Sequence, residues 1–242
     1  MKTSSYYLIF TLFSLVLSSC YTDKIRVSPG DTITLREVPV ENYNSIEIGN
    51  GFNAFITFSE DSESIQVEGN SNLQDLIIAQ IRDNKLTVKL KNRVNVKGNP
   101  TLNVYLSAKA IENFKATADS NITLENTLVA NKAYISLSAD SYFTGELDVK
   151  DLELRASADV RADLYGHIDY LNANLSADVR LSDYDLVVND LKLKMVADCG
   201  ANLTVKNSIY IDAKADCILK YKGNASIVYQ DLKADARLVK MD

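Results

Sequence analysis

Apolar and polar residues alternate strictly along most of the C-terminal half of the chain. Residues 152–158 read Leu-Glu-Leu-Arg-Ala-Ser-Ala, and residues 171–177 read Leu-Asn-Ala-Asn-Leu-Ser-Ala. Successive side chains of a β-strand point to opposite faces of its sheet, so this alternation predicts strands with one buried and one solvated face. The pattern returns in the segments on either side, and it predicts an all-β fold.

Each alternating segment ends in the dipeptide Ala-Asp, which recurs with a spacing of 18 to 21 residues. A fixed period of this size is typical of a solenoid, in which one unit is stacked on itself. About nineteen residues cannot hold a strand together with a crossover helix. The period therefore predicts a single-stranded parallel β-helix of about 19–20 residues per coil, right-handed by the usual rule for parallel crossovers. The aspartates are Asp119, Asp140, Asp159, Asp178, Asp198, Asp216 and Asp235.

In such a helix, residues at equal distances from their aspartates lie one above the other, about 4.8 Å apart. Apolar residues seven, five and three positions before each aspartate are expected to fill the core, with Val228 among them in the last coil. Cys199 and Cys217 each follow an aspartate directly, so they should be stacked and face inward. Parallel side chains keep their Cβ atoms further apart than a disulfide prefers, so free buried thiols are favoured over a disulfide.

The segment 31–110 is also rich in alternating stretches, but it is less regular than the repeats in 111–242. It is predicted to begin the same solenoid with one insertion, with a helical turn or two over 72–78, and to protect the open strand edge. At the opposite end, only the basic residues Lys233, Arg237 and Lys240 are available to protect the open strand edge from pairing with another chain. The C-terminal edge is therefore expected to be a contact surface, covered by another subunit or by its own basic residues.

The N-terminus has the layout of an export signal. Lys2 precedes an apolar run over residues 6–17, and Leu-Ser-Ser leads directly to Cys20. A charged start, an apolar stretch of about a dozen residues and small residues before a cleavage point indicate a secretory signal peptide over 1–19. The residues before Cys20 resemble a bacterial lipobox, which predicts a lipid on Cys20 and a tether over 20–30. The alternative is an ordinary signal peptide with a chance cysteine.

Composition adds limits to this interpretation. The chain has 242 residues and 46% hydrophobic residues, enough to fill one elongated core over 31–242. Its net charge is −6 and its pI about 5.0, so it lacks the basic footprint of a nucleic-acid-binding protein.

The chain resembles the putative auto-transporter adhesin head GIN domain family, common among secreted and lipid-anchored proteins of Bacteroidetes. The resemblance covers roughly residues 36–240 and ends in the repeated coils. Family members usually carry Ser-Gly-Ser-Gly-like steps where this chain has Ser-Ala-Asp, so the aspartate column belongs to this sequence. The resemblance implies a β-helical fold, a surface or periplasmic location and no catalytic residues. It rests on Arg36–Val40, Tyr43–Gly49, Ala54–Ile56, Val67–Gly69 and Lys85–Val88.

A column of carboxylates about 4.8 Å apart costs roughly 0.9 kcal/mol per adjacent pair in water. One interpretation offsets this repulsion with hydrogen bonds from turn N–H groups two residues on and with nearby basic side chains. The other is a ladder for Ca²⁺ or a similar hard cation, which prefers oxygen ligands. No other metal or cofactor site is predicted. The basic residues of the first interpretation are Arg161, Arg180 and Arg237 after the aspartates, and Lys115, Arg155 and Lys194 before them.

No catalytic residue is predicted, because a catalytic site is normally one irregular constellation and the aspartate column is evenly repeated. His167, the only histidine, lies beside Gly166 and is expected in a corner. Tyr134, Tyr210 and Tyr229 share one outward position without occupying adjacent coils throughout, so they are interpreted as scattered surface aromatics, with a binding strip as the alternative.

The sequence thus favours an outer-membrane lipoprotein of the cell envelope, surface-exposed or periplasmic, that acts as an adhesin-like binding or structural module. The alternatives are a carbohydrate-active β-helix enzyme and a self-assembling envelope protein. The predicted partners are a membrane through the lipid anchor, a glycan or protein ligand, and a second copy of the chain through the C-terminal edge.

Overall fold

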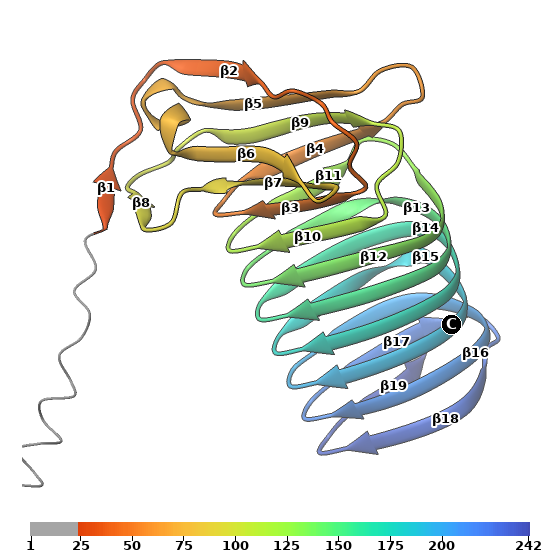
Figure 1. Cartoon of the computed structure of the whole chain (residues 1–242). Helices are drawn as coiled ribbons and strands as arrows, with labels where there is room; N and C mark the ends of the chain where they lie inside the picture. The colour runs from red at the N-terminus through yellow and green to blue at the C-terminus, as the bar shows by residue number, and fades with distance from the viewer. Residues whose placement is uncertain (1–23) are drawn as a thin grey trace, which may run out of the picture.

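Long parallel strands, each bent into one coil, form the regular part of the molecule (Figure 1). The computed structural model describes residues 24–242, apart from the side chains of residues 182 and 183. The coil strands pair in parallel, as the repeat period predicted. They are β12 (Leu128–Ser138), β13 (Tyr142–Ser157), β14 (Val160–Ser176), β15 (Val179–Val196) and β16 (Gly200–Lys214), followed by the shorter β17 (Ile218–Lys222), β18 (Ser226–Lys233) and β19 (Arg237–Lys240).

The coils are superposed in the predicted register. Five positions before the aspartates, Ile135 pairs with Leu154, which is followed in the next coils by Ala173, Leu193 and Ile211. Each of these side chains is fully buried. Burial of one large aliphatic side chain contributes about 1.5–3 kcal/mol, so these stacked rows of inward-facing side chains supply most of the stability of the folded state.

The N-terminal coils do not follow chain order. The coil of β3 (Ser45–Gly49) and β4 (Asn53–Phe58) lies between two coils that come later in the sequence. On one side it pairs with β10 (Asn113–Thr117) and β11 (Asn121–Leu124). On the other it pairs with β7 (Lys85–Leu90) and β9 (Leu102–Ala108).

Antiparallel strands cover the N-terminal end of the stack (Figure 1). The irregular segment was expected to cover this edge, and it does so with antiparallel pairing, partly between strands that are distant in the sequence. β5 (Ser64–Asn70) pairs with β9 and β2 (Ile33–Glu37) pairs with β5, while β6 (Ile77–Arg82) pairs with β7. The expected helical turn is η2 (Ser71–Leu76), a 3-10 helix.

The predicted signal peptide over 1–19 and the predicted lipid site Cys20 lie outside the described residues. Part of the predicted tether contributes β1 (Ile25–Val27), which pairs in parallel with β8 (Val94–Val96). No helix in residues 24–242 is long and apolar enough to cross a membrane.

The prediction that Val228 fills the core is wrong. The register between β16 and β18 shifts by one residue, so that Ile209 pairs with Ile227 and Tyr210 pairs with Tyr229. Val228 is the extra residue at this bulge, and 65% of it is exposed. A bulge leaves one residue unpaired and turns the strand locally, which is why counting back from the aspartate fails here.

Tyr43 gives a pH-dependent prediction. Burial, with a smaller contribution from Glu63, raises the pKa of Tyr43 to about 12, from 10.0. Its buried hydroxyl has no hydrogen-bond partner among the described residues. Because the folded-state pKa is the higher one, the stability linked to Tyr43 is present below pH 10 and is lost as the pH rises to about 12, by about 2–3 kcal/mol.

Replacing Tyr43 by Phe should remove this loss and add about 1 kcal/mol at neutral pH, because an unpaired buried hydroxyl is removed. Denaturant unfolding of both proteins between pH 8 and 12 measures the difference. A constant gap between the two curves would contradict the assignment.

Candidate functional site

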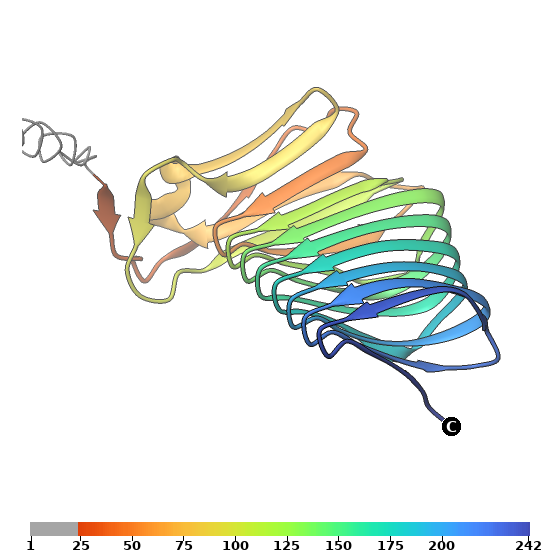
Figure 2. The same ribbon diagram turned by 90° about the horizontal axis from the view of Figure 1, so that it is seen from below.

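The Ala-Asp steps form left-handed two-residue turns along one edge of the solenoid. In Ala158-Asp159 the φ angles are 64° and 57°, and the other six steps are also positive at both residues. Asn50-Gly51, with φ of 57° and 76°, makes a turn of the same kind. The N–H of Gly51 donates to the carbonyl of Ala118 at 2.9 Å, so it continues the file into the N-terminal coils. Figure 2 shows these narrow turns aligned along one edge of the stack.

The backbone N–H groups of the turns hydrogen-bond to the next coil. Asp140 N donates to Ala158 O at 3.1 Å, and Ala139 N donates to Ser157 O at 3.2 Å. The N–H two residues after Asp140, that of Tyr142, donates to Ser120 O at 3.1 Å. The prediction that these N–H groups would bond to the aspartate side chains is therefore wrong, because carbonyl groups of neighbouring coils already accept them.

All seven aspartates are exposed on this ridge. Of these seven aspartates, only Asp178 has an ion pair within residues 24–242, with Arg180 at 2.9 Å. Of the other expected partners, Arg155 pairs with Glu153 at 2.6 Å and Lys115 with Glu47 at 3.3 Å. Exposure to water and salt, rather than pairing, is what weakens the repulsion.

The cation ladder stays a prediction. No group of three or more His, Cys, Asp or Glu side chains in the described part of the chain is arranged to hold a metal ion. If the ladder binds Ca²⁺, millimolar Ca²⁺ should raise the melting temperature while Na⁺ at matched ionic strength should not. An equal response to both salts would exclude the ladder.

A row of polar side chains crosses the outer face that follows the turns. Asn121 donates to Asn53 at 2.7 Å, Asn53 donates to Asn103 at 3.0 Å, and Asn103 donates to the Glu68 carboxylate at 2.7 Å. Glu68 also accepts a hydrogen bond from the Tyr105 hydroxyl at 3.1 Å. The strands β5, β9, β4 and β11 place these residues side by side at the N-terminal end (Figure 1).

Two aromatic rings stand next to this row. Phe55 and Tyr105 are directly paired residues of β4 and β9, and their ring centroids lie 5.3 Å apart with the planes inclined by 16°. A cavity of about 380 Å³ adjoins them. We call this region the aromatic cavity; it is lined by Phe55, Thr57, Ser64, Tyr105, Leu106, Ser107 and Glu125.

A second cavity, of about 480 Å³, lies beside the corner opposite the turns, lined in part by residues 126–132. It contains Glu60 and Glu112, two carboxylates outside the aspartate column, together with Lys109 and Lys132. A pair of carboxylates with a basic group is what a carbohydrate-active enzyme would require. Glu60 and Glu112 are both exposed.

The sequence profile of the putative auto-transporter adhesin, head GIN domain family matches residues 42–225. The chain belongs to this family.

Several solved structures have the same fold as this head GIN domain protein, although their sequences are less than 20% identical to it. A putative adhesin from Bacteroides fragilis has a TM-score of 0.75 at 18% identity, with 88% of this chain and 98% of that one covered. A putative adhesin from Parabacteroides merdae gives 0.71 at 15% identity, covering 90% and 100%. A putative lipid binding protein from Parabacteroides distasonis gives 0.70 at 12% identity, covering 90% and 100%. No curated protein matches the sequence.

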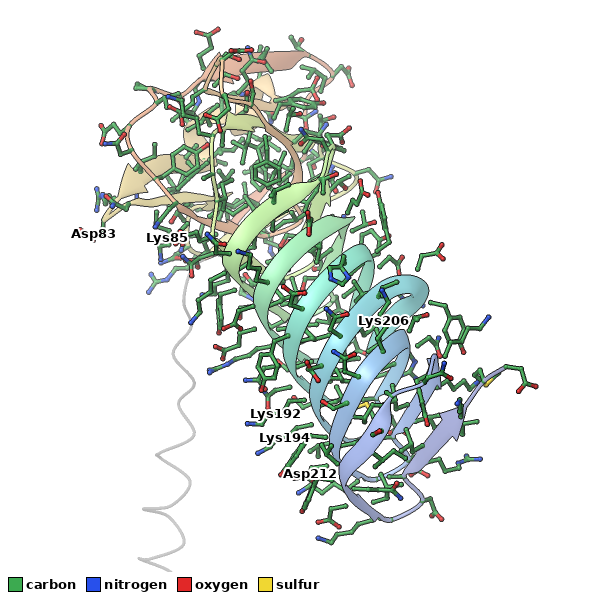
Figure 3. The ribbon with its side chains drawn as sticks, turned by 90° about the vertical axis from the view of Figure 1, so that its right-hand side faces the viewer. Asp83, Lys85, Lys192, Lys194, Lys206 and Asp212 are labelled. Carbon is green, nitrogen blue, oxygen red and sulfur yellow. The ribbon has the colours of Figure 1, made fainter. Side chains whose placement is uncertain are left out.

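In this head GIN domain protein, the three tyrosines that share one outward position do not form a continuous strip, and only two of them stack. Tyr210 and Tyr229 stack at 4.3 Å between ring centroids, with the planes at 13°. Lys192 lies over the other face of Tyr210 at 6.0 Å. Tyr134 is separated from them by three coils and instead faces Arg155 at 5.6 Å. Figure 3 shows Lys192 and Lys194 projecting outward from β15, with Asp212 of β16 nearby.

His167 lies beside Gly166 in β14, as a corner residue with a side chain 40% exposed. Its Nε2 is 3.2 Å from a carboxylate oxygen of Asp169. Asn189 also donates to Asp169, at 2.8 Å. These three polar groups satisfy one another on the surface.

The two cysteines of the repeats are buried, free and stacked, as predicted. Cys199 N donates to Cys217 Sγ at 3.4 Å, and the Cys217 thiol donates to Lys214 O at 3.2 Å. Ser120 holds the equivalent place in an earlier coil, where its hydroxyl donates to Thr117 O at 2.8 Å. The thiols therefore stabilise the turns by donating hydrogen bonds to backbone carbonyl groups just before them.

Both thiols should resist modification in the folded protein. Burial raises the pKa of the Cys217 thiol, so little reactive thiolate forms at neutral pH. In a chain carrying Cys20→Ser, a thiol reagent should label Cys199 and Cys217 at least about a thousandfold more slowly than in denaturant, because labelling requires opening of the fold. Fast labelling of the native protein would contradict this role.

Sequence reasoning missed the aromatic cavity. Phe55 and Tyr105 lie 50 positions apart in the sequence, and the inserted coil order brings them together. Each belongs to an alternating stretch, which predicted an outward side chain but not which neighbour it would meet.

Proposed function

We propose that this protein is a non-catalytic exported lipoprotein of the outer membrane that acts as an adhesin-like binding module. Family membership and the neighbouring adhesin structures support a cell-surface or envelope role. The single observation that carries the binding role is the aromatic cavity, a partly exposed aromatic pair beside hydroxyl and carboxylate side chains on a rigid outer face. A few convergent polar groups around an apolar surface are typical of a binding site.

Rigidity favours recognition by this surface. The outer side chains stand on strands whose backbones are hydrogen-bonded on both sides, so little conformational freedom is lost when a ligand binds. The test is a glycan array and an adhesion assay on immobilised host and bacterial surfaces, with the whole protein and an unrelated lipoprotein as control. Binding at the level of the control to every surface would reject the proposal.

The lipid anchor is part of the proposal. Metabolic labelling with a palmitate analogue should mark the chain, and Cys20→Ser should abolish both the label and the association with membranes. The variant Cys199→Ser is the matched control, because it removes a buried thiol and leaves the lipobox intact. Equal labelling of the Cys20→Ser protein would show that the chain is not anchored at this residue.

Self-association is the second candidate function, favoured by apolar exposure on β18. Within residues 24–242, β18 pairs only with β16. Ile227, Val228 and Tyr229 are exposed by 46%, 65% and 42%. An unpaired apolar strand edge is a template for another chain. Light scattering over a concentration series should show a dimer or larger species that Val228→Lys converts to monomer; a wild-type monomer at all concentrations would eliminate this candidate.

A further inference from the structure

The aromatic cavity combines a partly exposed ring surface with polar groups that are held in place. Tyr105 is 39% exposed, and Phe55 beside it is half-buried. Large aromatic side chains on a surface lose little conformational entropy when they bind a ligand. Here the two rings also stack on each other, so each restricts the other before any ligand arrives.

Hydrogen bonds fix the orientation of Tyr105. Its hydroxyl donates to Glu68 at 3.1 Å, and Asn103 donates to the same carboxylate oxygen at 2.7 Å. Behind Asn103, Asn53 and Asn121 continue the row with all amides donating in one direction. Partial burial and the neighbouring Glu68 raise the pKa of Tyr105, so the hydroxyl keeps its proton and remains a donor. The ring is therefore preorganised.

The cavity offers hydroxyl groups and one carboxylate on its walls. Thr57 and Ser64 each supply a hydroxyl, and Glu125 supplies a carboxylate that can accept hydrogen bonds from ligand hydroxyls. The Ser107 hydroxyl already donates to Ser62 O at 2.6 Å, so toward a ligand it acts as an acceptor. None of the residues that line it is lysine or arginine. A ligand suited to these walls carries several hydroxyl groups and no negative charge.

We propose that the aromatic cavity binds a neutral sugar unit, with the C–H face of the sugar ring packed against the Phe55–Tyr105 pair and its hydroxyl groups directed to Glu125 and the wall hydroxyls. This inference rests on the proposed binding function and names the class of its ligand. A ring face of partly positive C–H groups is attracted to the negative face of an aromatic ring.

Size and charge narrow the ligand further. Cavities that hold small molecules measure about 300–1,000 Å³, so the 380 Å³ here suits one or two sugar rings at the end of a glycan. Glu125 in the wall and Glu68 behind Tyr105 repel a carboxylate. The site should therefore prefer neutral hexoses over uronic acids.

Ligand-observed NMR tests the proposal on the full chain in a detergent without a sugar head group. The probes are glucose, galactose, mannose, N-acetylglucosamine, their disaccharides and glucuronic acid. At least one neutral sugar should bind, and Phe55→Ala should weaken it at least tenfold. Tyr210→Ala is the matched control, because it removes a ring from the stacked Tyr210–Tyr229 pair and should leave sugar binding unchanged. Melting curves check that each variant is folded.

Glu125→Gln separates recognition from a structural effect. It keeps the size of the side chain and removes its charge, so binding of glucuronic acid should strengthen toward that of the neutral sugars. Sugar binding that survives Phe55→Ala, or no binding of any neutral sugar, would overturn the site. If no neutral sugar binds but the same protein still attaches to a surface in the adhesion assay, the proposed binding function stands and only the assignment of a sugar as its ligand is rejected.

Discussion

Replacing Gly166 by alanine is expected to destabilise the protein by more than about 3 kcal/mol, because a Cβ at this position would lie 2.2 Å from the carbonyl oxygen of Leu147 in the neighbouring coil. The backbone of Gly166 has a φ of 101°, which residues with side chains rarely adopt. In a domain of this size the loss corresponds to roughly 6–12 °C in melting temperature. Differential scanning calorimetry or denaturant unfolding measures it.

Gly223 and Gly51 provide an internal comparison. A Cβ on Gly223 would also lie 2.2 Å from a carbonyl oxygen, that of Val205, so Gly223→Ala should be as damaging. Gly51 has a positive φ of 76° but open space around it, so Gly51→Ala should cost only about 1–2 kcal/mol of backbone strain. Equal losses for Gly51→Ala and Gly166→Ala would show that backbone strain, not the close approach of the coils, decides the effect.

Replacing all seven alanines of the Ala-Asp turns by glycine is expected to stabilise the protein by about 4–6 kcal/mol. An alanine in the left-handed conformation costs about 1–2 kcal/mol, whereas glycine adopts it freely. The greater conformational freedom of glycine in the unfolded chain reduces this gain by about 0.4–1 kcal/mol per turn. Four of these alanines are exposed and three, Ala118, Ala197 and Ala215, are half-buried, so removal of the methyl groups leaves no enclosed cavity.

Urea unfolding of the sevenfold variant and of one single variant, Ala158→Gly, measures the total and its share per turn. Ala173→Gly is the matched control, because Ala173 is a fully buried residue of β14, and this change should destabilise the protein. A sevenfold variant less stable than the parent would mean that the alanine methyl groups contribute to the packing of the turns.

The regular half of the fold could be predicted because its signals are local and repeated. Leu154 and Ala173 belong to stretches whose alternation predicts both the strand and its buried face, and the period predicts which residues lie above each other. The left-handed form of the turns was not predicted, since Ala-Asp is not a usual pair for it. The only clue was Asn50-Gly51, whose two residues favour this conformation.

The candidate site could not be predicted, because it depends on pairings between distant segments. Asn53 meets Asn103 and Asn121 only since the β3–β4 coil lies between two later coils. Alternation tells whether Phe55 points outward, but it does not tell that Tyr105 is its neighbour. The prediction for Val228 failed for a related reason. A bulge of one residue changes the face of every residue whose position is counted across it.

The intercalated position of the β3–β4 coil sets the order in which the chain can fold. This coil is synthesised early, yet one of its edges has no partner until residues 85–108 have been made, and the other has none until residues 113–124 have been made. Repeats farther along pair with adjacent sequence and can nucleate alone, as solenoids do. Such long-range pairing is slow to form. The N-terminal coils and the antiparallel strands that cover them are therefore expected to assemble last, onto repeats that have already folded.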